Sequence, residues 1–179
     1  MKRLLILTCI LFPFIVFGNS YQRSIDSINH LIKTSTSETK KIELLTKSGQ
    51  YYIESNNHTQ ALDCFLQMLN LCKHKQQDSL KIVCYNQISR IFFYQNNFAK
   101  SDYYNNLALK LSKKNPLLEG DYYKRKGDVF ASQLVYDSAQ FYYAITEKLY
   151  KKSKKTDSLR IAGLYANLSI TYYQTDKVK

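Results

Sequence analysis

The sequence predicts an all-α protein built as a solenoid of helical hairpins. Residues that break helices are scarce, with 5 glycines and 2 prolines in 179 residues, and this favours long helices joined by short turns. Apolar residues recur at helical spacing, as in the stripe of Ile88, Ile91 and Phe92. A pattern of small and aromatic residues returns about every 40 residues, which is typical of stacked repeats. A chain of this length suits one domain or one repeat array.

Residues 1–18 have the features of a signal peptide. Lys2 and Arg3 form a short basic segment, and an uncharged, mainly apolar run follows from Leu4 to Phe17. An uncleaved anchor is the alternative, but a membrane span needs about 20 apolar residues and this run is shorter. We therefore expect an exported protein, periplasmic or associated with the cell envelope. After cleavage it should contain no transmembrane span.

Residues 19–37 are expected to contain an N-terminal capping helix. Ile25, Ile28, Leu31 and Ile32 lie at helical spacing. Such a helix can cover the apolar face of the first repeat, which no other unit precedes.

The remaining chain, 38–179, is expected to form a repeat array. The Asn-Asn pairs at 56–57 and 96–97 indicate turns inside the first two hairpins. Capping residues begin further helices: Asp137 within the third hairpin, and Asp78, Asn115 (before Pro116) and Asp157 at the start of units. These signals predict units at 38–77, 78–115 and 116–156, with a half unit at 157–179.

Small residues set the register of the repeats. The first small residue of each unit lies at 49, 89, 127 and 169, so the intervals are 40, 38 and 42 residues. An aromatic residue follows three positions later, and in the full units a second small residue follows after twelve. Small side chains let two helices cross near the lower end of the usual separation of about 8–10 Å. The repeat-defining residues are Gly49, Tyr52, Ala61, Phe65, Ser89, Phe92, Ser101, Gly127, Phe130, Ala139, Tyr143, Ser169 and Tyr172.

This pattern resembles the tetratricopeptide repeat (TPR), whose unit is two antiparallel helices stacked into a right-handed superhelix. Two features differ from the family. The period is near 40 and not about 34 residues, and Ser101 and Asn105 replace an alanine and an aromatic residue. The architecture resembles the exported N-terminal array of bacterial TPR sensors and regulators. In those proteins a transmembrane helix and a cytosolic DNA-binding or kinase module follow the array.

The resemblance implies a binding groove lined by the first helix of each unit, where many such arrays bind extended peptides. Some members hold a terminal carboxylate with a clamp of lysines and asparagines. Arg90 and Asp128 stand where that clamp has asparagine, so we do not expect a clamp here. The alternative for all groove positions is packing between helices. The expected partner-binding residues are Arg90, Phe93, Tyr94, Lys124, Arg125, Asn167 and Tyr173.

The sequence contains no sign of catalytic chemistry. His30, His58 and His74 have no partner at metal-ligand spacing, and no glycine-rich phosphate loop follows a strand. We therefore expect neither an enzyme nor a bound metal or cofactor. The formal net charge of +12 favours an acidic protein or peptide partner. Export argues against nucleic acid as the partner.

Three cysteines follow the expected cleavage point. Cys64 and Cys72 lie eight residues apart on one predicted helix, about 12 Å along its axis, which is too far for a disulfide. Cys72 and Cys84 flank a predicted turn and could pair. Small buried thiols are the alternative.

The last predicted helix carries Leu164, Leu168, Ile170 and Tyr172, which have only the preceding unit to pack against. A partner or second copy in a homodimer could cover this C-terminal face, or the helix could fray. The chain could also be a truncated relative of a longer protein. The sequence therefore favours a non-enzymatic scaffold of the bacterial cell envelope, with an orphan sensor domain of a TPR regulator or histidine kinase as the alternative.

Overall fold

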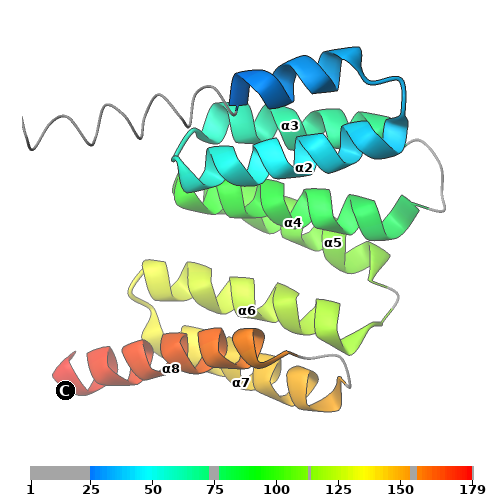
Figure 1. Cartoon of the computed structure of the whole chain (residues 1–179). Helices are drawn as coiled ribbons and strands as arrows, with labels where there is room; N and C mark the ends of the chain where they lie inside the picture. Colours follow the sequence, from blue (N-terminus) through cyan, green and yellow to red (C-terminus); the bar gives the residue numbers. More distant parts are fainter. Residues whose placement is uncertain (1–24, 73–76, 113, 154–156, 179) are drawn as a thin grey trace, which may run out of the picture. The chain divides into compact units, whose positions relative to one another are not determined.

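The chain is helical throughout the part that the computed structural model describes, residues 25–72, 77–112, 114–153 and 157–178, with no strand in these ranges. The expected signal peptide, 1–18, lies outside them. The all-α prediction is confirmed. After a helix at residues 25–34 come α2 (Glu38–Glu54), α3 (His58–Leu71), α4 (Asp78–Tyr94), α5 (Phe98–Leu111), α6 (Pro116–Ser132), α7 (Tyr136–Lys152) and α8 (Ser158–Val178), as Figure 1 shows.

Consecutive helices pack as hairpins within two compact units, Met1–Leu71 and Cys72–Lys179. The first unit contains the hairpin α2–α3, on which the helix at 25–34 packs through a hydrogen bond from Asn29 to the Tyr52 hydroxyl. The second contains the hairpins α4–α5 and α6–α7, with α8 against α7 (Figure 1). The structure therefore has the expected succession of helical hairpins. Among the described helices, none combines the length and apolarity needed to cross a membrane.

The turn and cap signals are largely where the sequence places them. Asn56 and Asn96 adopt left-handed backbone angles, φ 58° and 56°, which asparagine tolerates better than most residues. The Asn115 side chain caps α6 by accepting from the Leu117 amide. Asp78 and Asp137, expected as caps, instead lie in the first turns of α4 and α7. A carboxylate there still interacts favourably with the helix dipole.

Glycine allows the closest helix crossings. In α2–α3, a Cβ on Gly49 would lie 2.7 Å from the Phe65 ring, and in α6–α7 one on Gly127 would lie 2.4 Å from the Tyr143 ring. Both rings are about 1% exposed, so neither can move aside. Each hairpin therefore pairs a glycine on its first helix with a buried ring sixteen residues later on its second.

The hairpin α4–α5 replaces this pair by Ser89 and Asn105, also sixteen residues apart. Both are buried. The Ser89 hydroxyl donates to the Ser101 carbonyl at 2.8 Å, and the Asn105 amide donates to the Tyr122 carbonyl at 3.1 Å. A serine fits at this crossing because the partner position carries no ring. We therefore expect the serine at position 89 and the missing ring at position 105 to compensate each other.

Asn105→Phe is expected to destabilise the protein by about 2 kcal/mol, because a ring placed as in the other two hairpins would meet the Cβ of Ser89. The double variant Ser89→Gly/Asn105→Phe restores the glycine–ring pair and should recover at least about 1 kcal/mol of that loss as a coupling energy. Urea unfolding of both single variants and the double variant measures this energy. Additive effects of the two substitutions would show that the positions do not compensate.

The three described cysteines, Cys64, Cys72 and Cys84, are free and buried, as expected for the alternative of small buried thiols. Burial raises the pKa of the Cys64 thiol to about 11 and that of Cys84 to about 12. Thiols with such raised pKa values are largely protonated near neutral pH and react slowly.

The four apolar side chains of α8 that were expected to have only the preceding unit to pack against fall into two pairs. Leu164 and Leu168 are buried, 0% and 9% exposed, because they join a core cluster with Ala139, Tyr143 and Tyr150. These two leucines therefore pack against the preceding unit, as expected, and that unit is sufficient to bury them. Ile170 and Tyr172 remain 59% and 56% exposed.

Candidate functional site

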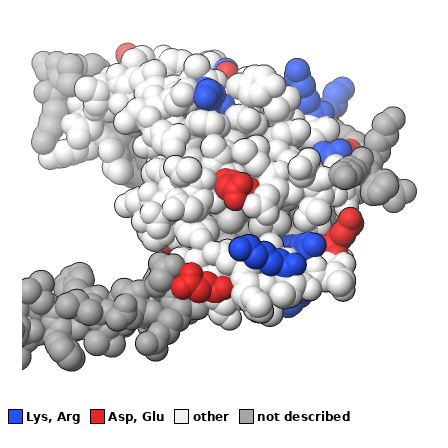
Figure 2. Space-filling view, turned by 90° about the horizontal axis from the view of Figure 1, so that it is seen from above, with Lys and Arg blue, Asp and Glu red and all other residues white. Residues whose placement is uncertain are grey.

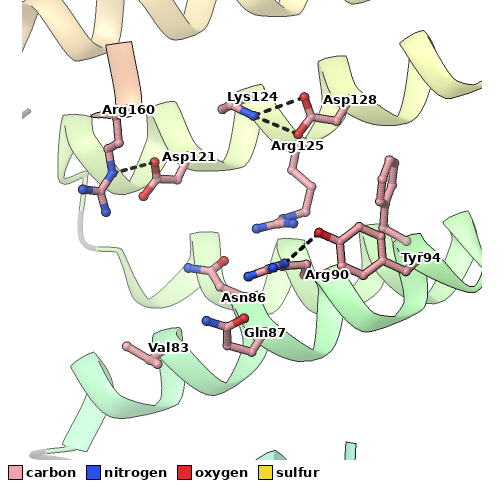
Figure 3. A pocket seen from close by; sticks show the side chains of 11 residues that line it. Val83, Asn86, Gln87, Arg90, Tyr94, Asp121, Lys124, Arg125, Asp128 and Arg160 are labelled. Atoms are coloured by element: carbon pink, nitrogen blue, oxygen red, sulfur yellow. Dashed lines mark hydrogen bonds and ion pairs between the residues drawn. The ribbon is translucent and has the colours of Figure 1, made fainter. Parts of the chain in front are cut away.

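A cavity of about 450 Å³ opens in the second unit, between α4, α6 and α8 (Figure 3). We call it the basic pocket. Its volume lies in the range of about 300–1,000 Å³ that is usual for ligand pockets. The lining residues are Val83, Asn86, Gln87, Arg90, Phe93 and Tyr94 of α4, Asp121, Lys124, Arg125 and Asp128 of α6, and Arg160 of α8.

Helical periodicity brings these side chains to one place. The lining positions are 83, 86, 87, 90, 93 and 94 on α4 and 121, 124, 125 and 128 on α6, so each lies three or four residues from another. Such spacing keeps every member on one face of its helix. The pocket is therefore bounded by two polar helix faces, with Arg160 entering from a third helix.

Two layers of polar contacts fix the wall formed by α6. In the first, Asp121 accepts a hydrogen bond from the Tyr150 hydroxyl at 2.6 Å and pairs with Arg160 at 3.2 Å. In the second, Asp128 accepts from the Tyr143 hydroxyl at 2.9 Å and from the Asn167 amide at 2.7 Å. The layers are seven residues apart on each of α6, α7 and α8. They hold three helices together with both carboxylates engaged.

Each layer also contains a close helix crossing. A Cβ on Gly120 would lie 2.5 Å from the Tyr150 ring, and a Cβ on Gly127 would lie 2.4 Å from the Tyr143 ring. In each layer the tyrosine ring therefore packs over a glycine, and its hydroxyl donates to the aspartate that follows that glycine in the sequence. Burial, together with the neighbouring carboxylate, raises the pKa of both tyrosines, so their hydroxyls remain donors.

Cations outnumber carboxylates in the pocket. The lining includes Arg90, Lys124, Arg125 and Arg160 against two aspartates, a net charge of +2. Lys124 bridges to Asp128 at 3.1 Å. In Figure 2, by contrast, the charged side chains on the visible face are scattered among uncharged ones without forming one continuous basic patch.

Polar atoms of opposite kinds are buried in this pocket without a partner among the described residues. The Nε of Arg125 is a donor, and the Oε1 of Gln87 is an acceptor. Burial lowers the pKa of the Arg125 guanidinium, while the charges of Asp128 and Asp121 raise it and the nearby charge of Arg90 lowers it further. Unpaired buried polar atoms are unfavourable by about 1–3 kcal/mol each, so the pocket is suited to a ligand with both donors and acceptors.

A second cavity, of about 340 Å³, adjoins the first and shares Phe93 and Asp128 with it. We call it the apolar pocket, since much of its lining is carbon. Ile170, which is 59% exposed, forms part of its rim. Its other lining residues are Ala131, Tyr136, Tyr143, Asn167, Thr171 and Gln174.

The structure brings together most of the residues expected at the groove. Five of them, Arg90, Phe93, Tyr94, Lys124 and Arg125, line the basic pocket. Asn167 lines the apolar pocket, and Tyr173 is 60% exposed and lines neither of these two.

Sequence reasoning missed Asp121, Arg160 and the tyrosines that position the two aspartates. A signal for them is present, because Gly-Asp occurs at 120–121 and again at 127–128, seven residues apart. The tyrosines at 143 and 150 have the same spacing. The described residues contain no group of three or more histidines, cysteines or acids arranged to hold a metal ion.

Comparison with known proteins shows a structural likeness. No protein-family model and no curated protein sequence matches the chain. The crystal structure of BtubC (BKLC) from P. vanneervenii is similar, with a TM-score of 0.63 and 18% sequence identity over 88% of this chain. The likeness shows the fold alone. The match spans 65% of that protein, so this chain corresponds to somewhat less than two thirds of its length.

Proposed function

We propose that this protein is a non-enzymatic scaffold of the bacterial cell envelope, and that it binds an extended segment of a partner protein in the basic pocket and the adjoining apolar pocket. The observation that carries the proposal is the pair of buried, unpartnered polar atoms in the basic pocket, the Arg125 Nε and the Gln87 Oε1. A peptide backbone supplies an acceptor for the first and a donor for the second.

The repeat pattern supports the same function. Glycine–ring crossings at sixteen-residue spacing in α2–α3 and α6–α7 are consistent with membership of the TPR family, in which the first helices of successive hairpins line a peptide groove. The basic pocket lies between two such helices, α4 and α6. Its apolar neighbour gives a partner side chain a place to bury carbon surface, worth about 1.5–3 kcal/mol for a large residue.

Peptide selection tests this proposal. Random peptides displayed on phage are selected on the purified chain, and the affinities of synthetic copies are then measured. Phe93→Ala and Lys124→Ala, which alter the two pockets, should weaken binding about tenfold, equivalent to about 1.4 kcal/mol. Lys148→Ala, an exposed position on α7, is the matched control and should leave affinity unchanged. Failure to enrich any peptide, or equal affinity in all variants, would refute the proposal.

A further inference from the structure

Two arginines of the basic pocket form no ion pair with the described residues. Arg90 of α4 and Arg125 of α6 both extend into the pocket, as Figure 3 shows. Arg90 donates to the Tyr94 hydroxyl at 3.0 Å and lies over that ring at 5.4 Å, but neither contact neutralises its charge. The Nε of Arg125 is buried and has no hydrogen-bond partner in the described part of the chain.

The carboxylates nearby are engaged by other groups. Asp128 accepts from Lys124, Tyr143 and Asn167. Asp121 accepts from Tyr150 and Arg160. Both aspartates are therefore engaged by residues of α7 and α8, and among the described residues neither forms an ion pair with Arg90 or Arg125, although both lie near enough to raise the pKa of Arg125.

Like charges that share a partly buried pocket repel each other, and the repulsion is stronger there than in water. An oxyanion placed between the guanidinium groups removes it. Arginine suits this role because its planar fork donates two parallel hydrogen bonds to a carboxylate or phosphate. An anion bound here also gives the Arg125 Nε the acceptor that it lacks.

We infer that the basic pocket contains an oxyanion subsite, in which Arg125 and Arg90 bind the carboxylate of an aspartate or glutamate side chain of the docked segment. This inference rests on the proposed function and specifies the partner's chemistry as acidic. A cavity of about 450 Å³ is much larger than a carboxylate alone, so the anion enters as part of a larger ligand. A phosphate group could provide the same chemistry.

Titration with defined anions tests the subsite. The probes are an acetylated, amidated tetraglutamate peptide, the matching tetraglutamine peptide and inorganic phosphate. Binding is followed through the Nε–H signals of the arginines in ¹H–¹⁵N spectra. Tetraglutamate should shift the Arg125 signal with saturation, and tetraglutamine should not.

The variants distinguish paired hydrogen bonds from an arginine guanidinium from a general attraction to positive charge. Arg125→Gln and Arg90→Gln should each weaken tetraglutamate binding about tenfold or more, as expected for hydrogen bonds to a charged group. Arg125→Lys keeps the charge but loses the fork and should still weaken binding severalfold. Lys148→Gln removes an exposed charge and should change affinity less than twofold. Thermal unfolding checks that each variant is folded.

Each outcome decides the inference. Saturation by phosphate in place of tetraglutamate supports an oxyanion subsite but overturns the assignment to a side-chain carboxylate. No shift at Arg125 with either anion, or equal weakening by Lys148→Gln, overturns the subsite. Peptides from the phage selection that need Phe93 but not Arg125 would leave the proposed function standing while refuting this inference.

Discussion

Gly127→Ala is expected to destabilise the protein by about 3 kcal/mol, because overpacking of this kind and the loss of a hydrogen bond to a charged group each contribute about 1–3 kcal/mol. The new methyl group would lie 2.4 Å from the Tyr143 ring. That ring is about 1% exposed, and its hydroxyl donates to Asp128 at 2.9 Å. Accommodating the methyl group therefore requires α6 and α7 to separate, or the hydrogen bond to break.

Gly163→Ala in α8 is the matched control. Apart from its chain neighbours and the backbone of its own helix, no atom of the described residues lies within 4 Å of a Cβ at this position, so the same substitution should stabilise the helix by about 0.5–1 kcal/mol. Urea unfolding of both variants and the wild type measures the two effects. A Gly127→Ala variant as stable as the wild type would show that the close crossing does not constrain the hairpin.

The repeat positions could be predicted because they depend on local spacing. Gly49, Ala61 and Phe65 recur in register with Gly127, Ala139 and Tyr143, and a helix crossing needs those sizes at those intervals wherever it occurs. In the hairpin α4–α5 the sequence shows Ser101 and Asn105 as departures from the family pattern. The structure adds that both are buried, and that the Ser89 hydroxyl donates to the Ser101 carbonyl.

The chemistry of the pocket could be predicted only in part. The resemblance to TPR arrays implies that Arg90, Lys124 and Arg125 face a groove, and in the structure all three line the basic pocket. Charge alone does not reveal which cations are paired. Asp121 pairs with Arg160, which lies on α8 and 39 residues later in the sequence. This contact depends on how α8 packs. Consequently the unpaired state of Arg125 follows from tertiary structure and not from any local pattern.

The burial of Tyr143 and Tyr150 predicts a steep loss of stability in alkali. Burial and the carboxylates of Asp128 and Asp121 raise the pKa of the two hydroxyls in the folded protein, whereas in the unfolded chain they ionise near pH 10. Above that pH the unfolded state therefore binds fewer protons than the folded state, and each further pH unit favours unfolding. The contribution is complete below pH 10 and is lost as the pH rises above it.

Two such groups should lower the free energy of unfolding by about 2.7 kcal/mol for each pH unit above about 10, since one proton corresponds to about 1.36 kcal/mol per unit. The thiols of Cys64 and Cys84 have pKa values raised to about 11 and about 12 in the folded protein. They also reduce stability in alkali, beginning at a lower pH, because a thiol in the unfolded chain ionises before a tyrosine does. The variant Tyr143→Phe/Tyr150→Phe keeps these thiols and removes only the two hydroxyls. Urea unfolding between pH 8 and 11.5 should therefore give the variant a shallower slope above pH 10, by nearly two protons. Parallel slopes would mean that the hydroxyls ionise normally in the folded protein, and that the bonds to Asp121 and Asp128 do not hold α6 against α7.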